Sequence, residues 1–172
     1  RSAAAKVAAN KGRAGVDRVT TEQFVERLDE NVEQLVRQLR EGTFRPQAIR
    51  RTWIPKLGSK ELRPLGIPTV RDRTVQAAIR HVIEPIFERD FAEHSYGFRP
   101  QRGCKDALRR VDKLLKQGYT WVVDADLKSY FDTIPHDKLL ARLRTKISDS
   151  RVLKLIEASI EASILEGMRE WT

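Results

Sequence analysis

The chain has 172 residues, of which 40% are hydrophobic, and this is enough for one well-cored domain or for one domain and part of a second. No apolar run approaches the roughly 20 residues of a membrane-spanning helix, and residues 1–10 lack the apolar core of a signal peptide. The single cysteine, Cys104, cannot form an internal disulfide. We therefore expect neither an integral membrane protein nor a disulfide scaffold, and a reducing compartment such as the cytoplasm is the simplest setting.

The charge of the chain favours a polyanionic partner. The formal net charge is +9, and the sequence pI is near 10.0, which is typical of proteins that bind nucleic acid. The charge is also uneven, because residues 45–73 contain eight basic residues and two acidic ones, and so carry +6 of the +9. This stretch is therefore predicted to face phosphate groups.

The first half of the chain alternates between loops, one helical stretch and two strands. Residues 10–19 are basic and contain glycine, and they predict a loop. Thr20 and Gln23 have the spacing of a capping box, and the helix that follows is expected to end at Gly42. Two strands are predicted at residues 48–56 and 62–68, joined by a turn at residues 58–60.

The second half is predicted to be mainly helical. A helix over residues 71–87 has Asp72 as its expected N-terminal cap. The spacing of apolar residues predicts three further helices, at residues 105–117, 136–146 and 151–165. The first of them should bury the apolar stripe formed by Leu108, Val111, Leu114 and Leu115, and Asp149 or Ser150 should cap the last. Between helices, residues 119–127 are rich in β-branched and aromatic residues and predict a strand.

Two carboxylates follow the apolar start of this predicted strand. Side chains alternate along a strand, so Asp124 and Asp126 would share one face while Trp121, Val123 and Ala125 bury on the other. Carboxylate oxygens are the ligands that Mg²⁺ prefers. The spacing alone is equally compatible with two aspartates that cap a turn or pair with nearby basic residues.

The residues after Asp126 narrow these alternatives. Leu127 and Lys128 lead to the adjacent aromatics Tyr130 and Phe131, and a new helix follows. This constellation resembles motif A of reverse transcriptases, in the form found in group II intron-encoded enzymes. The resemblance implies that Asp126 is catalytic and binds the two Mg²⁺ ions, that Phe131 packs beneath the sugar and excludes a 2′-hydroxyl, and that Leu127 belongs to the nucleotide site. It places Asp124 outside the metal shell.

Other segments resemble the same family in the same order, and they cover nearly the whole chain. They are N-K-G-R-A-G-V-D (10–17), I-P-K (54–56), R-P-L-G-I-P-T (63–69), R-D-R (71–73) and S-Y-G-F-R-P (95–100). By resemblance, Lys56 and Arg63 bind the triphosphate of the incoming nucleotide, as charge-assisted hydrogen bonds would allow. Five further arginines are candidates for RNA contacts: Arg13, Arg50, Arg51, Arg71 and Arg73. The alternative for Arg13 is an ordinary loop residue, and for the other four it is a structural ion pair.

Two motifs leave their roles open at this point. The glycines Gly12 and Gly15 either approach template RNA through their backbone amides or belong to an ordinary loop. Phe98 and Arg99 are interpreted as packing and salt-bridge residues rather than as substrate contacts.

The resemblance implies an α+β fold of the right-hand polymerase type. It would be mostly helical, with a small antiparallel fingers hairpin and the first strand of the palm. Residues 1–120 would form the fingers and residues 121–172 the start of the palm. The Y-A-D-D turn that completes the family's active site does not occur in the sequence. We therefore expect a truncated piece that cannot polymerise alone and that is prone to self-association through its cut surface.

The function implied by the resemblance is RNA-directed DNA polymerisation. The substrates would be an RNA template, a DNA primer and deoxynucleoside triphosphates, with Mg²⁺ as the cofactor. One alternative is a maturase that binds its intron RNA and assists splicing without polymerase activity. Another is a related reverse transcriptase of a bacterial defence or diversification system.

Overall fold

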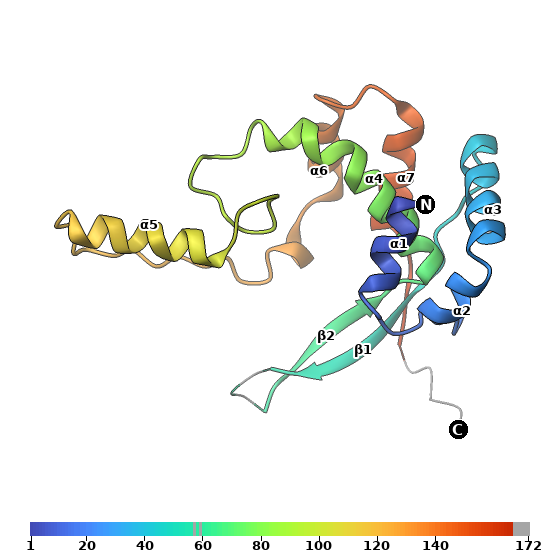
Figure 1. Ribbon diagram of the computed structural model, residues 1–172, viewed down its shortest axis with the longest axis horizontal. Helices are drawn as coiled ribbons and strands as arrows, with labels where there is room; N and C mark the ends of the chain where they lie inside the picture. Colours follow the sequence, from blue (N-terminus) through green and yellow to red (C-terminus); the bar gives the residue numbers. More distant parts are fainter. Residues whose placement is uncertain (57, 59, 167–172) are drawn as a thin grey trace. The chain divides into compact units, whose positions relative to one another are not determined.

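The fold is described by a computed structural model that covers residues 1–56, 58 and 60–166. The chain divides into a first unit, Arg1–Val82 with His136–Thr172, and a second unit, Ile83–Pro135, with the boundary inside one helix (Figure 1). The described residues form helices and one small sheet, so the predicted α+β class is confirmed. Ser59 of the predicted turn and residues 170–172 lie outside the described residues.

The core of the first unit lies among helices that follow one another in the sequence. Helix α1 (Ser2–Ala9), which was not predicted from the sequence, contributes Ala4 and Val7. Helices α2 (Thr21–Glu26) and α3 (Leu28–Glu41) contribute Phe24 and Leu35. The buried cluster is completed by Phe44, Val70 and Val75.

The helical stretch that follows residues 10–19, here called the glycine loop, is divided by a short break into α2 and α3. The predicted capping box is confirmed, because Thr20 Oγ1 accepts from the Gln23 amide at 3.2 Å and Gln23 Oε1 accepts from the Thr20 amide at 2.9 Å. Arg27 leaves helical geometry, and the Asn31 side chain bridges the break by donating to the Phe24 carbonyl at 2.9 Å. Gly42 ends α3 with φ of 68°, a left-handed conformation that glycine adopts without strain.

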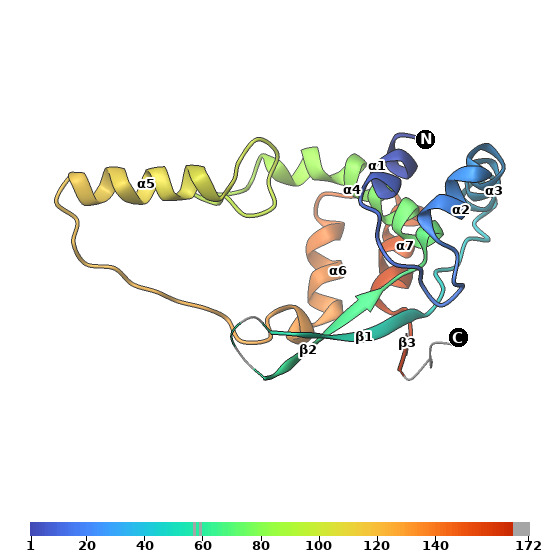
Figure 2. The same cartoon turned by 60° about the horizontal axis from the view of Figure 1, so that its bottom comes forward.

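The sheet has the order β2-β1-β3. Strands β1 (Ile49–Pro55) and β2 (Leu62–Ile67) form the predicted antiparallel hairpin. Strand β3 (Ile164–Leu165) runs parallel to the start of β1 (Figure 2). Residues 161–165 were predicted to be helical, and this was wrong. The Ile49 amide donates to the Ser163 carbonyl at 2.7 Å, so pairing with β1 replaces a further helical turn.

Three other helices contribute to the first unit. Helices α6 (His136–Arg144) and α7 (Ser150–Ile160) pack against each other, and Asp149 caps α7 as predicted by accepting from the Arg151 amide at 2.8 Å. Helix α4 (Val70–Glu88) begins earlier than predicted and contains Pro85 in its last turn. Its cap is Thr69 rather than Asp72, because the Thr69 hydroxyl accepts from the Asp72 amide at 3.1 Å.

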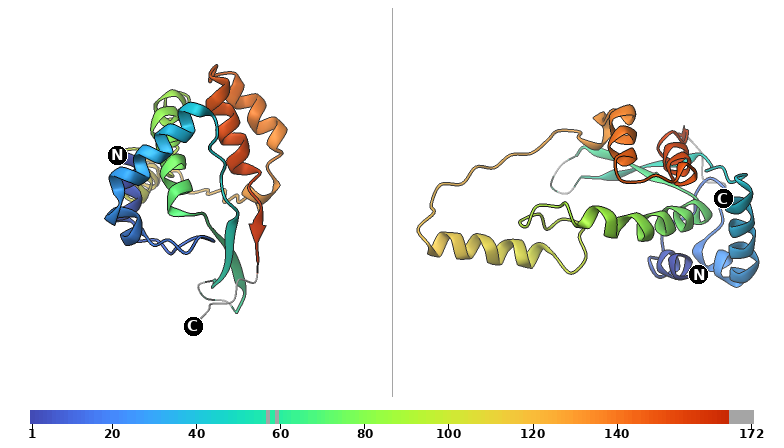
Figure 3. Two further views of the ribbon diagram at one scale, coloured as in Figure 1. Left: turned by 90° about the vertical axis from the view of Figure 1, so that its right-hand side faces the viewer. Right: turned by 90° about the horizontal axis from the view of Figure 1, so that it is seen from above.

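The second unit departs most from the sequence-based expectations. Helix α5 (Cys104–Lys116) forms as predicted (Figure 3). Its residues Leu108, Val111 and Leu115 are nevertheless exposed. Residues 119–127 form no strand, and Trp121 and Val123 are 97% and 92% exposed, so their predicted burial was wrong. A strand needs a neighbour for its backbone hydrogen bonds, and no described strand pairs with this segment. A short 3₁₀ helix, η1 (Phe131–Thr133), follows.

Candidate nucleic-acid interface

One face of the β1–β2 hairpin carries the two residues predicted to bind the triphosphate. Arg63 lies opposite Ile54 in the register, and the Lys56 amide donates to the Glu61 carbonyl at 2.9 Å, which extends the ladder by one residue pair. Because side chains alternate, Lys56 and Arg63 are diagonal neighbours on the same face. Lys56 Nζ lies 3.5 Å from a Glu61 carboxylate oxygen, and both side chains are exposed. Such a surface pair is weak and leaves the ammonium group available to a stronger anion.

Residues from both faces of the hairpin line a cleft of about 660 Å³, and Lys56 and Arg63 are not among its lining residues. By register, Thr52, Ile54, Leu65 and Ile67 lie on the face of Lys56 and Arg63 and line the cleft, and the lining residues of the opposite face are Trp53, Pro55 and Gly66. Cationic residues from outside the sheet also line it: Lys11, Arg13 and Arg73. The cleft therefore combines an apolar strand surface with basic residues from the glycine loop and from α4.

The glycine loop before α2 packs tightly on the start of α4. A Cβ atom at Gly15 would lie 2.7 Å from the Thr69 Cα and amide nitrogen, where backbone atoms cannot move aside. Lys11 and Arg18 adopt positive φ values of 44° and 59°, which are uncommon for residues with a side chain. Close packing against backbone atoms thus explains the glycine at position 15 of the N-K-G-R-A-G-V-D segment.

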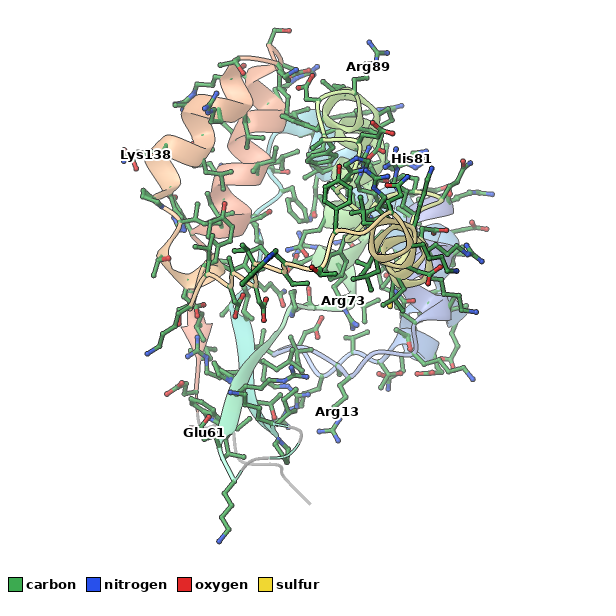
Figure 4. All side chains as sticks on the ribbon, turned by 90° about the vertical axis from the view of Figure 1, so that its left-hand side faces the viewer. Arg13, Glu61, Arg73, His81, Arg89 and Lys138 are labelled. Carbon is green, nitrogen blue, oxygen red and sulfur yellow. The ribbon has the colours of Figure 1, made fainter. Side chains whose placement is uncertain are left out.

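Arg73 connects α4 to this loop. Its Nη2 donates to the Arg13 carbonyl at 2.9 Å. In Figure 4 the Arg13 side chain extends from the loop on the side away from Arg73. Burial lowers the pKa of Arg73, and the Asp17 carboxylate opposes that change. The pKa of Asp17 is raised, first by burial and further by Asp72, while a hydrogen bond from the Val19 amide and the charge of Arg73 act in the other direction.

Asp72, which the sequence assigned to a cap, has a different role. It is only 2% exposed, and its Oδ2 accepts from the Gln47 amide at 2.9 Å. Its Oδ1 is buried and makes no hydrogen bond within the described residues. Asp72 therefore ties the chain that enters β1 to the first turn of α4.

The remaining candidate arginines are mostly occupied within the protein. Arg71 donates to Gln38 Oε1 at 2.8 Å, and its guanidinium lies 4.7 Å from the centre of the Phe44 ring. Arg51 Nη1 lies 3.4 Å from a Glu166 oxygen. Arg50 and Arg51 are half-buried, and their Nε atoms make no hydrogen bond within the described residues. Arg13 is the exposed one of the five.

The predicted metal and sugar residues all belong to the second unit. Asp126 is exposed, Leu127 is 70% exposed and Phe131 is 85% exposed. The rings of Tyr130 and Phe131 meet edge to face, with centroids 5.5 Å apart. Across residues 1–56, 58 and 60–166, no three or more His, Cys, Asp or Glu side chains gather as metal ligands. The described residues do not fit a two-metal site on their own.

Two features of the site were missed by sequence reasoning. Lys11 lines the cleft, although only its place between Asn10 and Gly12 marked it in the sequence. The cluster of Asp17, Asp72 and Arg73 joins residues too distant in the chain for any local pattern to indicate it. The interpretation of Arg99 as a salt-bridge residue is confirmed, since its Nη2 lies 2.7 Å from Glu88 Oε1. Phe98, in contrast, is 96% exposed and does not pack in a core.

A positively charged groove is a feature of proteins that bind single-stranded nucleic acid. Comparison with known families identifies the class. Residues 54–171 match the family described as "Reverse transcriptase (RNA-dependent DNA polymerase)", and the chain belongs to this family.

Its relatives include proteins encoded by group II introns. The chain is 40% identical over 139 residues to the group II intron-encoded protein LtrA of Lactococcus lactis subsp. cremoris, a match that covers 81% of this chain and 23% of LtrA. It is 43% identical over 156 residues to protein YkfC of Escherichia coli (strain K12), covering 88% of this chain and 41% of YkfC. It is 32% identical over 96 residues to nuclear intron maturase 1, mitochondrial, of Arabidopsis thaliana, covering 56% of this chain and 13% of that protein.

The chain thus spans less than half the length of these relatives. None of the helices in the described part of the chain combines the length and apolarity that a bilayer crossing needs.

Proposed function

We propose that this chain is the fingers and the start of the palm of a group II intron-type reverse transcriptase. Residues 1–120 would be the fingers and residues 121–172 the start of the palm. The main support is one observation: in a member of the reverse transcriptase family, Lys56 and Arg63 lie on one face of a hairpin, and four residues of that face line a basic cleft. A cytoplasmic location agrees with this function.

In the proposed reaction the primer 3′-hydroxyl attacks the α-phosphate of a deoxynucleoside triphosphate. A new O3′–P bond forms, and the bond to the pyrophosphate breaks. Lys56 and Arg63 would hold the β- and γ-phosphates and so orient the α-phosphate for in-line attack. Phe131 and Leu127 would contact the sugar, and the Phe131 ring would exclude a 2′-hydroxyl.

Enzymes of this family use divalent metal ions, and Asp126 is the carboxylate of this chain proposed to bind Mg²⁺. Among the described residues, no three or more His, Cys, Asp or Glu side chains form a group that could hold a metal ion. Mg²⁺ sites need several oxygen ligands from protein, substrate and water. We therefore expect the chain alone to lack polymerase activity and to depend on further carboxylates.

The cleft is proposed to bind single-stranded RNA. Lys11 and Arg13 supply exposed cations, and Thr52, Ile54, Leu65 and Ile67 supply the strand surface. Arg50, Arg51, Arg71 and Arg73 serve mainly as structural residues in this proposal, because each is half-buried and most have partners within the protein.

Similarity to a nuclear intron maturase supports a second candidate function. A maturase-type protein would bind intron RNA through the same cleft and assist splicing. In that case RNA binding would persist while nucleotide incorporation is lost, so the two functions can be separated by measuring both.

The test is primer extension on an RNA template with the polypeptide in its full natural length. Asp126→Ala should abolish synthesis, Lys56→Ala and Arg63→Ala should raise the KM for deoxynucleotides, and Phe131→Ala should admit ribonucleotides. Lys138→Ala changes an exposed lysine of α6 and should behave as the unmodified protein. Undiminished synthesis by Asp126→Ala would refute the polymerase assignment, and RNA binding without any synthesis by the unmodified protein would favour the maturase.

A further inference from the structure

Arg73 has surroundings that differ from those of a phosphate-binding side chain. Its guanidinium donates to the Arg13 carbonyl, and a Cβ atom added at Gly12 would overlap its Nη1. Its Nε is buried and makes no hydrogen bond within the described residues. The guanidinium is therefore directed at the backbone of residues 12 and 13.

We propose that Arg73 is a positioning residue that holds residues 11–13 against the first turn of α4, so that Lys11 and Arg13 line the hairpin cleft. We call the contact of the Arg73 guanidinium with the backbone of this loop the latch. This inference rests on the RNA-binding role proposed above for the cleft. It gives Arg73 an indirect part in binding, because the cations that meet the phosphates belong to the loop that Arg73 holds.

The backbone of the loop explains why a latch is needed. Lys11 has a φ of 44°, a left-handed conformation that a lysine adopts at a cost in free energy. The loop is fixed on one side by Gly15, which packs on the backbone of Thr69 and Pro68. Arg73 fixes it on the other side, at Arg13. Without that hydrogen bond, Lys11 can relax to a negative φ, and its side chain leaves the cleft.

The electrostatic surroundings keep Arg73 in place. Asp17 lies within range of Arg73, and their opposite charges attract. Asp72 raises the pKa of Asp17 and is itself bonded to the Gln47 amide. The guanidinium is thus hydrogen-bonded to the loop and attracted by the half-buried Asp17 carboxylate, and solvent phosphate has to compete with both.

Gly12 provides a way to test the latch without removing the arginine. The clashing atom belongs to the far end of a flexible side chain, so alanine at this position displaces the guanidinium rather than the backbone. Gly12→Ala should therefore open the latch while the charge of Arg73 is retained. A direct phosphate contact by Arg73 makes the opposite prediction, because a displaced but charged arginine still attracts phosphate.

The experiment measures the binding of a fluorescein-labelled oligouridylate to the chain by anisotropy over a range of salt concentrations. For single strands the slope of log K against log salt is about −0.7 per phosphate contact. If the latch places both Lys11 and Arg13 in the cleft, Arg73→Ala and Gly12→Ala should each reduce the magnitude of the slope by about 1.4, which corresponds to two phosphate contacts. The double variant should lose no more than either single variant. Arg73→Lys, which keeps one donor, should restore part of the slope.

Additive losses in the double variant, or an unchanged slope in Gly12→Ala, would overturn the latch. Arg37→Ala is the matched control, since Arg37 is an exposed arginine of α3 outside the cleft. The slope of this variant should not change beyond the small effect of net charge.

A second readout separates the latch from the RNA-binding proposal. Amide hydrogen exchange of residues 11–17, measured without RNA, should accelerate in Arg73→Ala and in Gly12→Ala. If Lys11→Ala with Arg13→Ala leaves RNA affinity intact, the proposed RNA site fails, and the exchange data still decide on the latch. Unchanged exchange in both variants would refute the latch itself.

Discussion

Leu35 of α3 and Leu108 of α5 occupy equivalent places on strongly amphipathic helices, yet Leu35 is 5% exposed and Leu108 is 63% exposed. The difference extends to the two units. Every buried apolar residue of the described chain belongs to the first unit, whereas residues 83–135 contain none. An apolar stripe indicates which face of a helix is stabilised by burial, but it does not indicate which part of the protein covers that face.

The two units also differ in the kind of contact that holds each of them together. The first unit is held by a shared core of helices α1, α2, α3 and α4. The second unit is organised by polar contacts around Arg99, which bonds to Glu88 and to the carbonyls of Ala92 and Ser95. Local unfolding should therefore begin in the second unit, where few apolar contacts oppose it.

The largest expected effect comes from the core. Phe24→Ala removes a side chain that is 5% exposed, and the free energy of unfolding of the first unit should fall by about 3–5 kcal/mol. Leu108→Ala in α5 is the matched change at an exposed apolar position and should cost less than about 1 kcal/mol. Hydrogen exchange resolved by peptide measures both. Equal losses would show that α5 is covered in solution and would break the comparison.

An intermediate effect is expected at Arg99, whose side chain is 6% exposed and lies 2.7 Å from Glu88. Arg99→Ala leaves Glu88 without its partner and should lower local stability by about 2–3 kcal/mol. Exchange of residues 89–103 should rise, while the core of the first unit keeps its protection. The control is Arg109→Ala, since Arg109 forms an exposed pair with Asp106. A matching loss of protection in α2 and α3 would mean that the two units unfold together.

The same contrast explains what the sequence could predict. Predictions that depend on residues close together in the sequence were confirmed. Examples are the capping box at Thr20 and Gln23 and the hairpin of β1 and β2. Expectations that depended on a distant partner were less successful. Residues 119–127 have strand-like composition, but no described strand pairs with them, and β3 was missed because its partner is more than one hundred residues earlier.

The candidate site divides in the same way. The hairpin is formed by residues close in the sequence, so the strands that carry Lys56 and Arg63 were predicted correctly, whereas their shared face follows from the register seen in the structure. The contact of Arg73 with the Arg13 carbonyl joins residues 60 positions apart. No spacing rule reaches that far, and the family pattern marked both residues without stating that they touch.

The smallest expected effect tests whether burial in the first unit extends to the glycine loop. Burial raises the pKa of Asp17 above its ordinary value of 3.8, so the Asp17 carboxyl group holds its proton more tightly in the folded chain than in the unfolded chain. The contribution of this group to the free energy of unfolding is fully present below the ordinary pKa and is lost as the pH rises through the raised pKa of the folded chain.

Asp17→Asn should remove this decline and flatten the pH dependence of the free energy of unfolding in the acidic range. Asp149 is the matched control, because hydrogen bonds from Arg151 lower its pKa. Asp149 stabilises the fold above its ordinary pKa, and that contribution is lost as the pH falls through the lowered value. Urea unfolding of the two variants across this range should therefore show slope changes of opposite sign. A slope change of the same sign would mean that folding lowers the pKa of Asp17 rather than raising it. No slope change would place Asp17 at an exposed surface and remove the glycine loop from the packed part of the first unit.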